Sequence, residues 1–207
     1  TSLNRLCSAY LAPAGSLVGD SSDDVETSVT TTKKVKVPAV DAKGNVIMKK
    51  GKPTYKTVDQ EVVTKTTTKV KRGWAGPVFM TSEEGGDESR AFAGNMDGQL
   101  VQLPRIGLAS WENLVPADIK SKATVIMGME DGSAIDSQLW MYRGTKTKTG
   151  EWYDRAGLNN GSPYVLAAGS IANDNAFRSS VGKNKPIDVT FEKVDWKATG
   201  LAREVRH

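Results

Sequence analysis

The chain has 207 residues, 38% of them hydrophobic and 25% charged, and this composition excludes a disordered tail and an integral membrane protein. Twenty Gly, eight Pro and only 7% aromatic residues disfavour a helical bundle and favour short strands joined by tight turns. We therefore expect an all-β protein. With one cysteine, Cys7, and one histidine, His207, an intramolecular disulfide is excluded, and common zinc sites and Ser-His-Asp triads nearly so. No apolar stretch is long enough to span a bilayer, so we expect no transmembrane segment.

The first block of the chain, 1–20, contains Cys7 within the run RLCSAYLAP. A lone cysteine is most often a small buried hydrophobe, whereas a thiolate also binds soft or borderline metals such as iron. Both interpretations of Cys7 stay open at this point. The sequence begins with Thr1 and shows no basic region followed by an apolar core, so we expect either a processed start or a piece of a longer polypeptide.

Residues 21–73 have the composition of a long β-ribbon. Two similar Thr/Val/Lys strips, 26–40 and 56–71, flank a Gly-bearing middle in which Lys43–Asn45 and Lys50–Lys52 are predicted turns. An isolated two-stranded hairpin is marginally stable in water. We therefore expect the ribbon to pack against the rest of the chain, a second subunit or another protein.

The formal net charge of +4 hides a strong asymmetry. Between Lys33 and Arg72 there are twelve basic and three acidic residues, so this segment carries +9 and the remainder −5. The lysines either contact a neighbouring subunit or an anionic partner, or they protect exposed strand edges from aggregation. Nucleic acid is not expected as the partner, because the segment has one Arg and one aromatic residue. The lysines that we expect to bind a partner are Lys33, Lys34, Lys36, Lys49, Lys50, Lys52, Lys65 and Lys69.

After the ribbon the chain reads as short strands bounded by Gly, Asp or Asn, which predicts a propeller-like or sandwich-like sheet assembly. Residues 167–178 are expected to form a loop or a short helical turn. The alternation in 186–196 predicts a strand with Ile187, Val189 and Phe191 on its buried face. The predicted organisation is a β-rich body, 1–20 and 74–207, with the basic ribbon inserted at 21–73.

Carboxylates gather where the predicted strands of the body give way to turns. Glu83 and Glu84 follow one apolar strand, Glu112 lies in the run SWEN, and Glu130 and Asp131 follow another apolar strand. Converging carboxylates repel one another unless a cation lies between them, and a hard cation such as calcium is the natural counter-charge. Acidic turns are also ordinary surface chemistry, so these residues alone do not choose between a calcium site and solvated loops.

Seven short runs follow one another along the chain: RLCSAYLAP, FMTSEE, ESRAFA, LPRIGLASWEN, ATVIMGMEDG, LWMYRGTKTKTG and RAGLNNGSPYVL. In this order they resemble the bacterial branch of the PhoX-type alkaline phosphatase and esterase-like β-propeller family. The resemblance covers about residues 1–20 and 74–196, and the ribbon at 21–73 has no counterpart in it.

The resemblance implies a periplasmic or extracellular propeller with a phosphomonoesterase site that uses calcium and iron. Bound cations would clamp the phosphate oxygens, so no catalytic histidine is required. The family's chain is longer, so further ligands and blades are expected from a remaining propeller segment or another subunit, and phosphatase activity of this chain alone is not expected. The residues that match the family's metal-binding positions are Cys7, Glu83, Glu84, Glu112, Glu130 and Asp131.

Two hypotheses of function follow. In the first, the chain is part of a secreted calcium- and iron-dependent phosphomonoesterase-like propeller, and the candidate ligands converge on one centre. In the second, it is a non-catalytic extracellular or surface assembly protein whose lysine-rich ribbon docks on a neighbouring subunit or an anionic partner. The second hypothesis predicts carboxylates scattered over separate turns.

Overall fold

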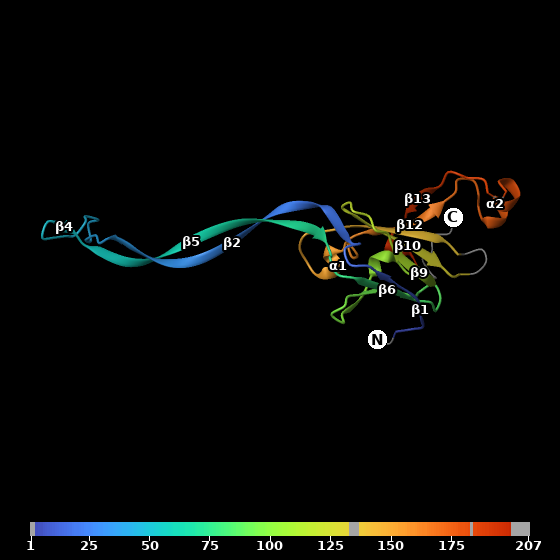
Figure 1. The fold of residues 1–207 in the computed structure, drawn as a ribbon, viewed down its shortest axis with the longest axis horizontal. Coiled ribbons are helices and arrows are strands. Elements are labelled where there is room, and N and C mark those ends of the chain that lie inside the picture. Colours follow the sequence, from blue (N-terminus) through green and yellow to red (C-terminus); the bar gives the residue numbers. More distant parts are fainter. Residues whose placement is uncertain (1–2, 133–136, 183, 200–207) are drawn as a thin grey trace. The chain divides into compact units, whose positions relative to one another are not determined.

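The computed structural model describes residues 3–132, 137–182 and 184–199 and consists mainly of antiparallel β-sheet (Figure 1). Its contacts divide the chain into two compact units. The first unit takes Thr1–Asp23 and Lys71–His207, and the second takes Asp24–Val70. The expectation of an all-β protein is confirmed.

A four-stranded antiparallel sheet begins the first unit. Its strands occur in the order β1-β6-β7-β8, and neighbouring strands are antiparallel. This is also their order along the chain, in which β2–β5 come between β1 and β6. In β6 the residues Val78 and Met80 are fully buried, because every second side chain of a strand points to the same face. The strands are β1 (Leu6–Ala12), β6 (Val78–Glu83), β7 (Ala91–Gly94) and β8 (Leu100–Gln102).

A five-stranded antiparallel sheet completes the first unit. Its order is β13-β12-β11-β10-β9, so it is a simple meander that the chain enters at β9. Burial alternates along β10 because successive side chains of a strand point to opposite faces of the sheet, and the buried positions are Thr124, Ile126, Gly128 and Glu130. The strands are β9 (Trp111–Pro116), β10 (Ala123–Glu130), β11 (Leu139–Thr145), β12 (Ser162–Ala167) and β13 (Thr190–Lys193).

Helical elements of the described residues are short and lie in the connections. The side chain of Asn173 caps α2 by accepting a 2.9 Å hydrogen bond from the backbone N–H of Ala176. Neither α-helix found in the described ranges has the length and hydropathy to cross a membrane. The helices are η1 (Pro104–Ile106), α1 (Trp152–Arg155), α2 (Asp174–Ser180) and η2 (Trp196–Ala198).

The core of the first unit lies where β1 and β6 of the four-stranded sheet contact β9 of the five-stranded sheet. Trp111 is 1% exposed and meets Trp140 edge to face, with 6.0 Å between ring centroids. Gly128 lies under this indole, because a Cβ at that position would come within 2.7 Å of the Trp111 ring. The close approach therefore requires glycine at position 128.

The strand predicted at 186–196 is shorter than expected. Only Thr190–Lys193 pair with β12, and Val189 is 44% exposed rather than buried. β13 is the edge strand of its sheet and has a single partner, and Trp196 already belongs to η2. The prediction of a continuous buried face was wrong, because alternation along an edge segment does not ensure that another layer covers it.

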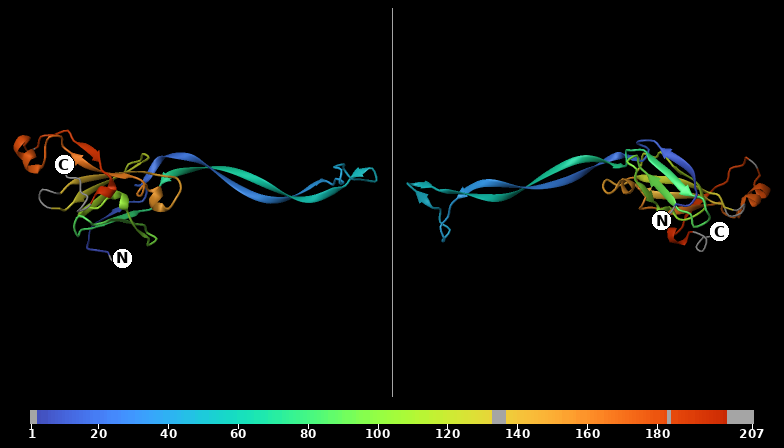
Figure 2. Two further views of the ribbon diagram at one scale, coloured as in Figure 1. Left: turned by 180° about the vertical axis from the view of Figure 1, so that it is seen from behind. Right: turned by 90° about the horizontal axis from the view of Figure 1, so that it is seen from below.

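Two long strands, β2 (Val18–Pro38) and β5 (Tyr55–Gly73), pair with each other as a two-stranded ribbon that makes up most of the second unit (Figure 2). Hydroxyl groups tie them together: Thr27 Oγ1 donates to the carbonyl of Thr66 at 3.2 Å, and Thr31 Oγ1 to that of Val62 at 3.4 Å. The partner on β5 moves back by four residues as the position on β2 advances by four, so the strands are antiparallel.

The ribbon ends in two small hairpins that meet at a ring of backbone hydrogen bonds. Ala39 N–H donates to Thr54 O at 2.9 Å, Thr54 N–H to Ile47 O at 2.9 Å, and Ile47 N–H to Ala39 O at 2.8 Å. The first hairpin closes with the bridge between Val40 and Val46.

The second hairpin pairs β3 (Met48–Lys49) with β4 (Lys52–Pro53). Lys50 and Gly51 form its turn with φ of 52° and 72°, the left-handed pair that two-residue hairpins favour. Both turns predicted from the sequence are therefore present.

Lys146 is fully buried beside the loop that precedes β10. Its ammonium group donates to the carbonyl oxygens of Ser121 at 3.1 Å, of Ala123 at 2.9 Å and of Ile119. Desolvation by burial is the main cause that lowers the pKa of Lys146. The charged group therefore holds a loop together through backbone carbonyls.

We expect Lys146→Met to lower the free energy of unfolding by about 3 kcal/mol, because three carbonyls lose a charged donor. Urea denaturation at neutral pH measures the change. Lys122→Met, at an exposed position of the same loop, is the control and should shift stability by no more than about 0.5 kcal/mol. Equal stability of the two variants would contradict this role.

Candidate metal centre

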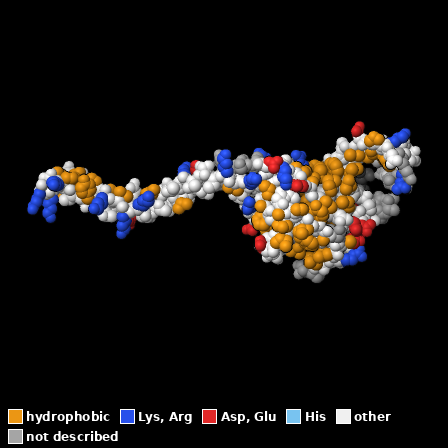
Figure 3. Space-filling view, in the orientation of Figure 1, with side chains coloured by type: hydrophobic (Ala, Val, Ile, Leu, Met, Phe, Trp, Pro, Cys, Tyr) orange, Lys and Arg blue, Asp and Glu red, His pale blue; other side chains and the backbone are white. Residues whose placement is uncertain are grey.

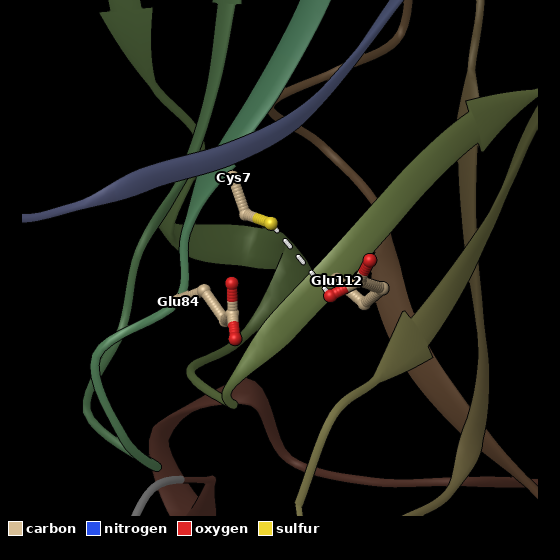
Figure 4. Close-up of side chains that lie close together, drawn as sticks. All are labelled: Cys7, Glu84 and Glu112. Atoms are coloured by element: carbon tan, nitrogen blue, oxygen red, sulfur yellow. Dashed lines mark hydrogen bonds between the residues drawn. The ribbon is translucent and has the colours of Figure 1, made fainter.

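Three candidate ligands from distant parts of the sequence lie together in the first unit (Figure 4). Cys7 comes from β1, Glu84 follows the last residue of β6, and Glu112 comes from β9. One ligand atom of each, the Cys7 sulfur and two carboxylate oxygens, lies within 4.8 Å of the others. The Cys7 thiol donates to Glu112 Oε2 at 3.7 Å.

The pairing of strands explains how these residues meet. Leu6 is the register partner of Glu83, so the start of β1 lies beside the end of β6 and brings Cys7 next to Glu84. β9 is the edge strand of the other sheet and contacts both β1 and β6. The cluster therefore lies at the junction of the two sheets, with ligands from each.

Both ligands that come from within strands occupy β-bulges. Leu6 pairs with Glu83 and Ala9 with Thr81, so β1 has one extra residue in the stretch that contains Cys7. Asn113 pairs with Met129 and Trp111 with Glu130, so Glu112 itself is an extra residue of β9. Bulges re-aim side chains and are over-represented next to active sites.

Charges and hydrogen bonds around Glu84 favour its ionised form. The hydrogen bond with Cys7 is the largest cause that lowers the pKa of Glu84, and the charge of Arg5 adds to it. Arg5 forms an ion pair with Glu84, and its own side chain is 66% exposed. Asp131 also shares a hydrogen bond with Glu84. Two ionised carboxylates this close repel each other, and a cation between them would offset that repulsion.

Glu83, another predicted ligand, is committed to a different interaction. Its Oε2 accepts from Arg90 Nε at 2.7 Å, and its Oε1 accepts from the backbone N–H of Asn4 at 2.7 Å and pairs with the Arg90 guanidinium at 2.5 Å. The side chain is 3% exposed, and the hydrogen bond from Arg90 is the main cause that lowers the pKa of Glu83 to about 2. Both carboxylate oxygens are therefore used within the protein.

The last two predicted ligands also differ from each other. Glu130 is buried and accepts a 3.0 Å hydrogen bond from Trp140 Nε1, which places its carboxylate in the core. Asp131 follows β10, where its backbone N–H donates to Ser110 O at 2.8 Å and its side chain reaches Glu84. The structure thus brings Cys7, Glu84 and Glu112 together with Asp131 beside them, and uses Glu83 and Glu130 elsewhere.

Two arginines that organise these carboxylates, Arg5 and Arg90, were not predicted from the sequence. Arg5 stands two residues before Cys7, and Arg90 immediately precedes β7. The signal for Arg90 was present, because a hairpin of β6 and β7 must place the residue before β7 opposite the residue that ends β6. The backbone N–H of Glu83 does donate to Arg90 O, at 2.9 Å.

The lysines predicted to bind a partner lie in the second unit and are all exposed. Lys65 forms a 2.8 Å ion pair with Glu26 across the ribbon. Such an exposed pair contributes little to stability. The predicted partner-binding residues found exposed are Lys33, Lys34, Lys36, Lys49, Lys50, Lys52, Lys65 and Lys69.

No family model, curated protein or solved structure matches this chain.

We expect the Glu83–Arg90 pair to make stability depend on pH. The folded-state pKa of about 2 lies below the ordinary value of 4.5, so the pair stabilises the fold above pH 4.5 and loses this contribution as the pH falls toward 2. Glu83→Gln should cost about 3 kcal/mol at neutral pH and remove that part of the acid dependence. Chemical denaturation from neutral to acidic pH tests this.

Glu192→Gln is the matched control, since Glu192 is an exposed residue of β13. It should keep the acid dependence of the unsubstituted chain. An unchanged acid dependence in Glu83→Gln would show that the pair does not contribute as argued.

Proposed function

We propose that this chain binds a metal cation between Cys7, Glu84 and Glu112 and forms part of a phosphomonoesterase-like β-propeller. One observation carries the proposal: three residues, chosen as ligands from the sequence, come from three separate elements and place their ligand atoms within 4.8 Å of one another. Chain neighbours meet easily in any fold, whereas residues separated by 28, 77 and 105 positions need the tertiary structure to meet.

The spacing of the donor atoms fits one cation. Metal–ligand bonds in proteins are about 2–2.5 Å long, so two ligands of the same ion lie no more than about 5 Å apart. The two bulges turn Cys7 and Glu112 out of the regular pleat at the place where Glu84 arrives. Asp131, in contact with Glu84, would supply a fourth donor, the third that is an oxygen.

The donor types indicate which metals to test. A thiolate prefers borderline or soft ions, so Cys7 favours iron, whereas the carboxylates of Glu84, Glu112 and Asp131 also suit calcium. We therefore propose iron as the cation at this centre, with calcium as the alternative. Three protein ligands leave coordination positions open for water and for oxygens of a phosphate ester, the proposed substrate class.

In this proposal the chain's own residues hold and orient the reacting groups. Cys7, Glu84 and Glu112 would hold the cation, which would stabilise negative charge on the phosphate as its bond to the leaving alcohol breaks. Arg5, largely exposed beside Glu84, would orient a phosphate oxygen through its planar guanidinium group. No histidine is needed for these roles.

The arrangement of the two sheets supports a propeller as the larger architecture. Propeller blades are four-stranded antiparallel sheets that surround a central channel. Each sheet of the first unit is a meander, and the strands through which the sheets meet include β1 and β9, the first of each meander. In a propeller β1 and β9 would be innermost. A remaining propeller segment or another subunit would supply further blades and ligands. From the resemblance alone, we propose a periplasmic or extracellular location.

The second candidate function is assembly through the ribbon. The observation that favours it is the exposure of several large apolar side chains, among them Met48 and Tyr55, beside the lysines at the end of the ribbon. This function does not depend on the metal centre, and one chain can carry both.

We expect the purified full chain to bind Fe²⁺ at this centre, and Cys7→Ser and Glu112→Gln each to weaken binding by about tenfold or more. Titration calorimetry and elemental analysis after dialysis measure this directly. Glu192→Gln, an exposed carboxylate outside the cluster, should bind like the unsubstituted chain.

Absence of metal from the unsubstituted chain, or equal binding by all variants, would overturn the metal centre. Hydrolysis of p-nitrophenyl phosphate, assayed separately with the metal-loaded chain, tests the reaction. Metal binding without hydrolysis would retain the centre and reject catalysis by this chain alone.

A further inference from the structure

The end of the ribbon exposes an unusual set of apolar side chains. We call residues 38–56 the ribbon tip; it comprises both small hairpins and lies wholly in the second unit. Side chains that a soluble protein normally covers are between 44% and 59% exposed here. They are Val40, Val46, Ile47, Met48 and Tyr55.

The same hairpins carry a dense positive charge. Five lysines and a single acidic residue, Asp41, occur in the ribbon tip, and all five lysines are exposed. Asp41 accepts hydrogen bonds from the backbone N–H groups of Lys43 and Asn45, at 2.8 and 2.9 Å, so its charge is used to hold its own turn. Figure 3 shows hydrophobic and basic side chains gathered at this end of the ribbon. The lysines are Lys43, Lys49, Lys50, Lys52 and Lys56.

The second hairpin concentrates three of these charges at one turn. Lys49 and Lys52 are register partners on β3 and β4, and Lys50 occupies the turn between them with a positive φ. Like charges directly opposite each other on neighbouring strands destabilise a sheet. A negatively charged surface against this hairpin would relieve the repulsion.

We propose that the ribbon tip binds an anionic phospholipid bilayer. Val46, Ile47, Met48 and Tyr55 would enter the interfacial layer, and the lysines would contact the phosphates of the lipid headgroups. Apolar burial and electrostatic attraction to anionic lipids add in interfacial binding, and each lysine close to such a surface contributes about a fivefold gain in affinity.

Edge protection explains lysines but not this apolar exposure. Charges along a strand edge oppose aggregation, whereas exposed apolar groups favour it, and the ribbon tip presents both. Across 26–70, whose side chains the structure describes throughout, none is buried, so the ribbon has no core of its own to cover them. The exposed apolar side chains therefore remain to be covered by a partner.

The composition of the ribbon favours a bilayer over a folded protein or a polyanion. Residues 24–70 contain ten lysines and no arginine, whereas protein interfaces are enriched in arginine and depleted in lysine. Lysine acts as a point charge suited to a diffuse layer of phosphates. A hydrophilic polyanion would offer nothing to Ile47 and Met48.

A second copy of the chain fits the charge of the ribbon tip less well. Outside 24–70 the sequence has eighteen basic and nineteen acidic residues, so the remainder is close to neutral. Charge complementarity therefore points to a strongly anionic surface rather than to self-association.

Vesicle flotation with the full-length chain tests the proposal. We expect binding to vesicles of phosphatidylglycerol and phosphatidylcholine in equal amounts and little binding to phosphatidylcholine alone. Ile47→Ser with Met48→Ser should weaken binding by about tenfold or more, and Lys49→Gln with Lys52→Gln by about twentyfold. All four residues are exposed, so circular dichroism melting should be unchanged.

Two matched pairs on the ribbon outside the tip serve as controls. Val29→Ser with Val63→Ser removes two valines that are 58% and 56% exposed, and Lys33→Gln with Lys34→Gln removes two charges. Each should change binding by no more than about twofold, because screening confines these contacts to the immediate surface.

Three outcomes would overturn the proposal. The first is no binding of the unsubstituted chain to anionic vesicles, or equal weakening by tip and control pairs. The second is equally tight binding to soluble heparin that Ile47→Ser with Met48→Ser does not alter, which would identify a polyanion site. The third is a lipid-free dimer in sedimentation velocity that the same pair of substitutions dissociates, which would identify a second copy as the partner.

Discussion

Two β-bulges, one in β1 at Cys7 and one in β9 at Glu112, control the chemistry available at the junction of the sheets. A regular strand alternates its side chains, and the alternation here is committed to the core, where Trp111 lies over Gly128. An extra residue in each strand frees one side chain from that alternation without loss of the neighbouring core contacts. Glu84 lies just after the end of β6 and needs no bulge of its own. It becomes part of the candidate centre because the two bulges bring Cys7 and Glu112 beside it.

The two adjacent glutamates at the end of β6 show how neighbours in sequence take different roles. Glu83 lies within β6 and has both oxygens bound to Asn4 and Arg90, whereas Glu84 lies just past the strand and meets Cys7. The carboxylate of Glu83, with both oxygens hydrogen-bonded, stabilises the hairpin of β6 and β7. The carboxylate of Glu84, next to the Cys7 thiol, can bind a cation. The fixed pair thereby holds the strand end from which Glu84 extends.

The all-β fold, the ribbon and both of its turns were predictable, because β-propensity and turn residues are local signals. The sequence also identified residue types that could bind a metal. It did not show that Glu84 lies in the candidate centre while Glu83 pairs with Arg90, or that the carboxylate of Glu130 accepts a hydrogen bond from Trp140. These roles depend on the register of the strands. A bulge shifts the register by one residue, and nothing in the amino-acid composition signals it. The prediction of a buried strand face over 186–196 was wrong for a related reason. Alternation of apolar residues indicates a face that could be buried, but it does not show that another layer covers that face.

The two units solve the problem of apolar surface in opposite ways. The first unit buries Trp111, Met80 and Ile126 between two sheets, and the buried ammonium group of Lys146 is satisfied by backbone carbonyls. The ribbon instead rests on its backbone ladder and on threonine, which stabilises strands without requiring burial. The exposed apolar residues of the ribbon tip therefore contribute little to the ribbon's own stability, and the proposed bilayer would cover them.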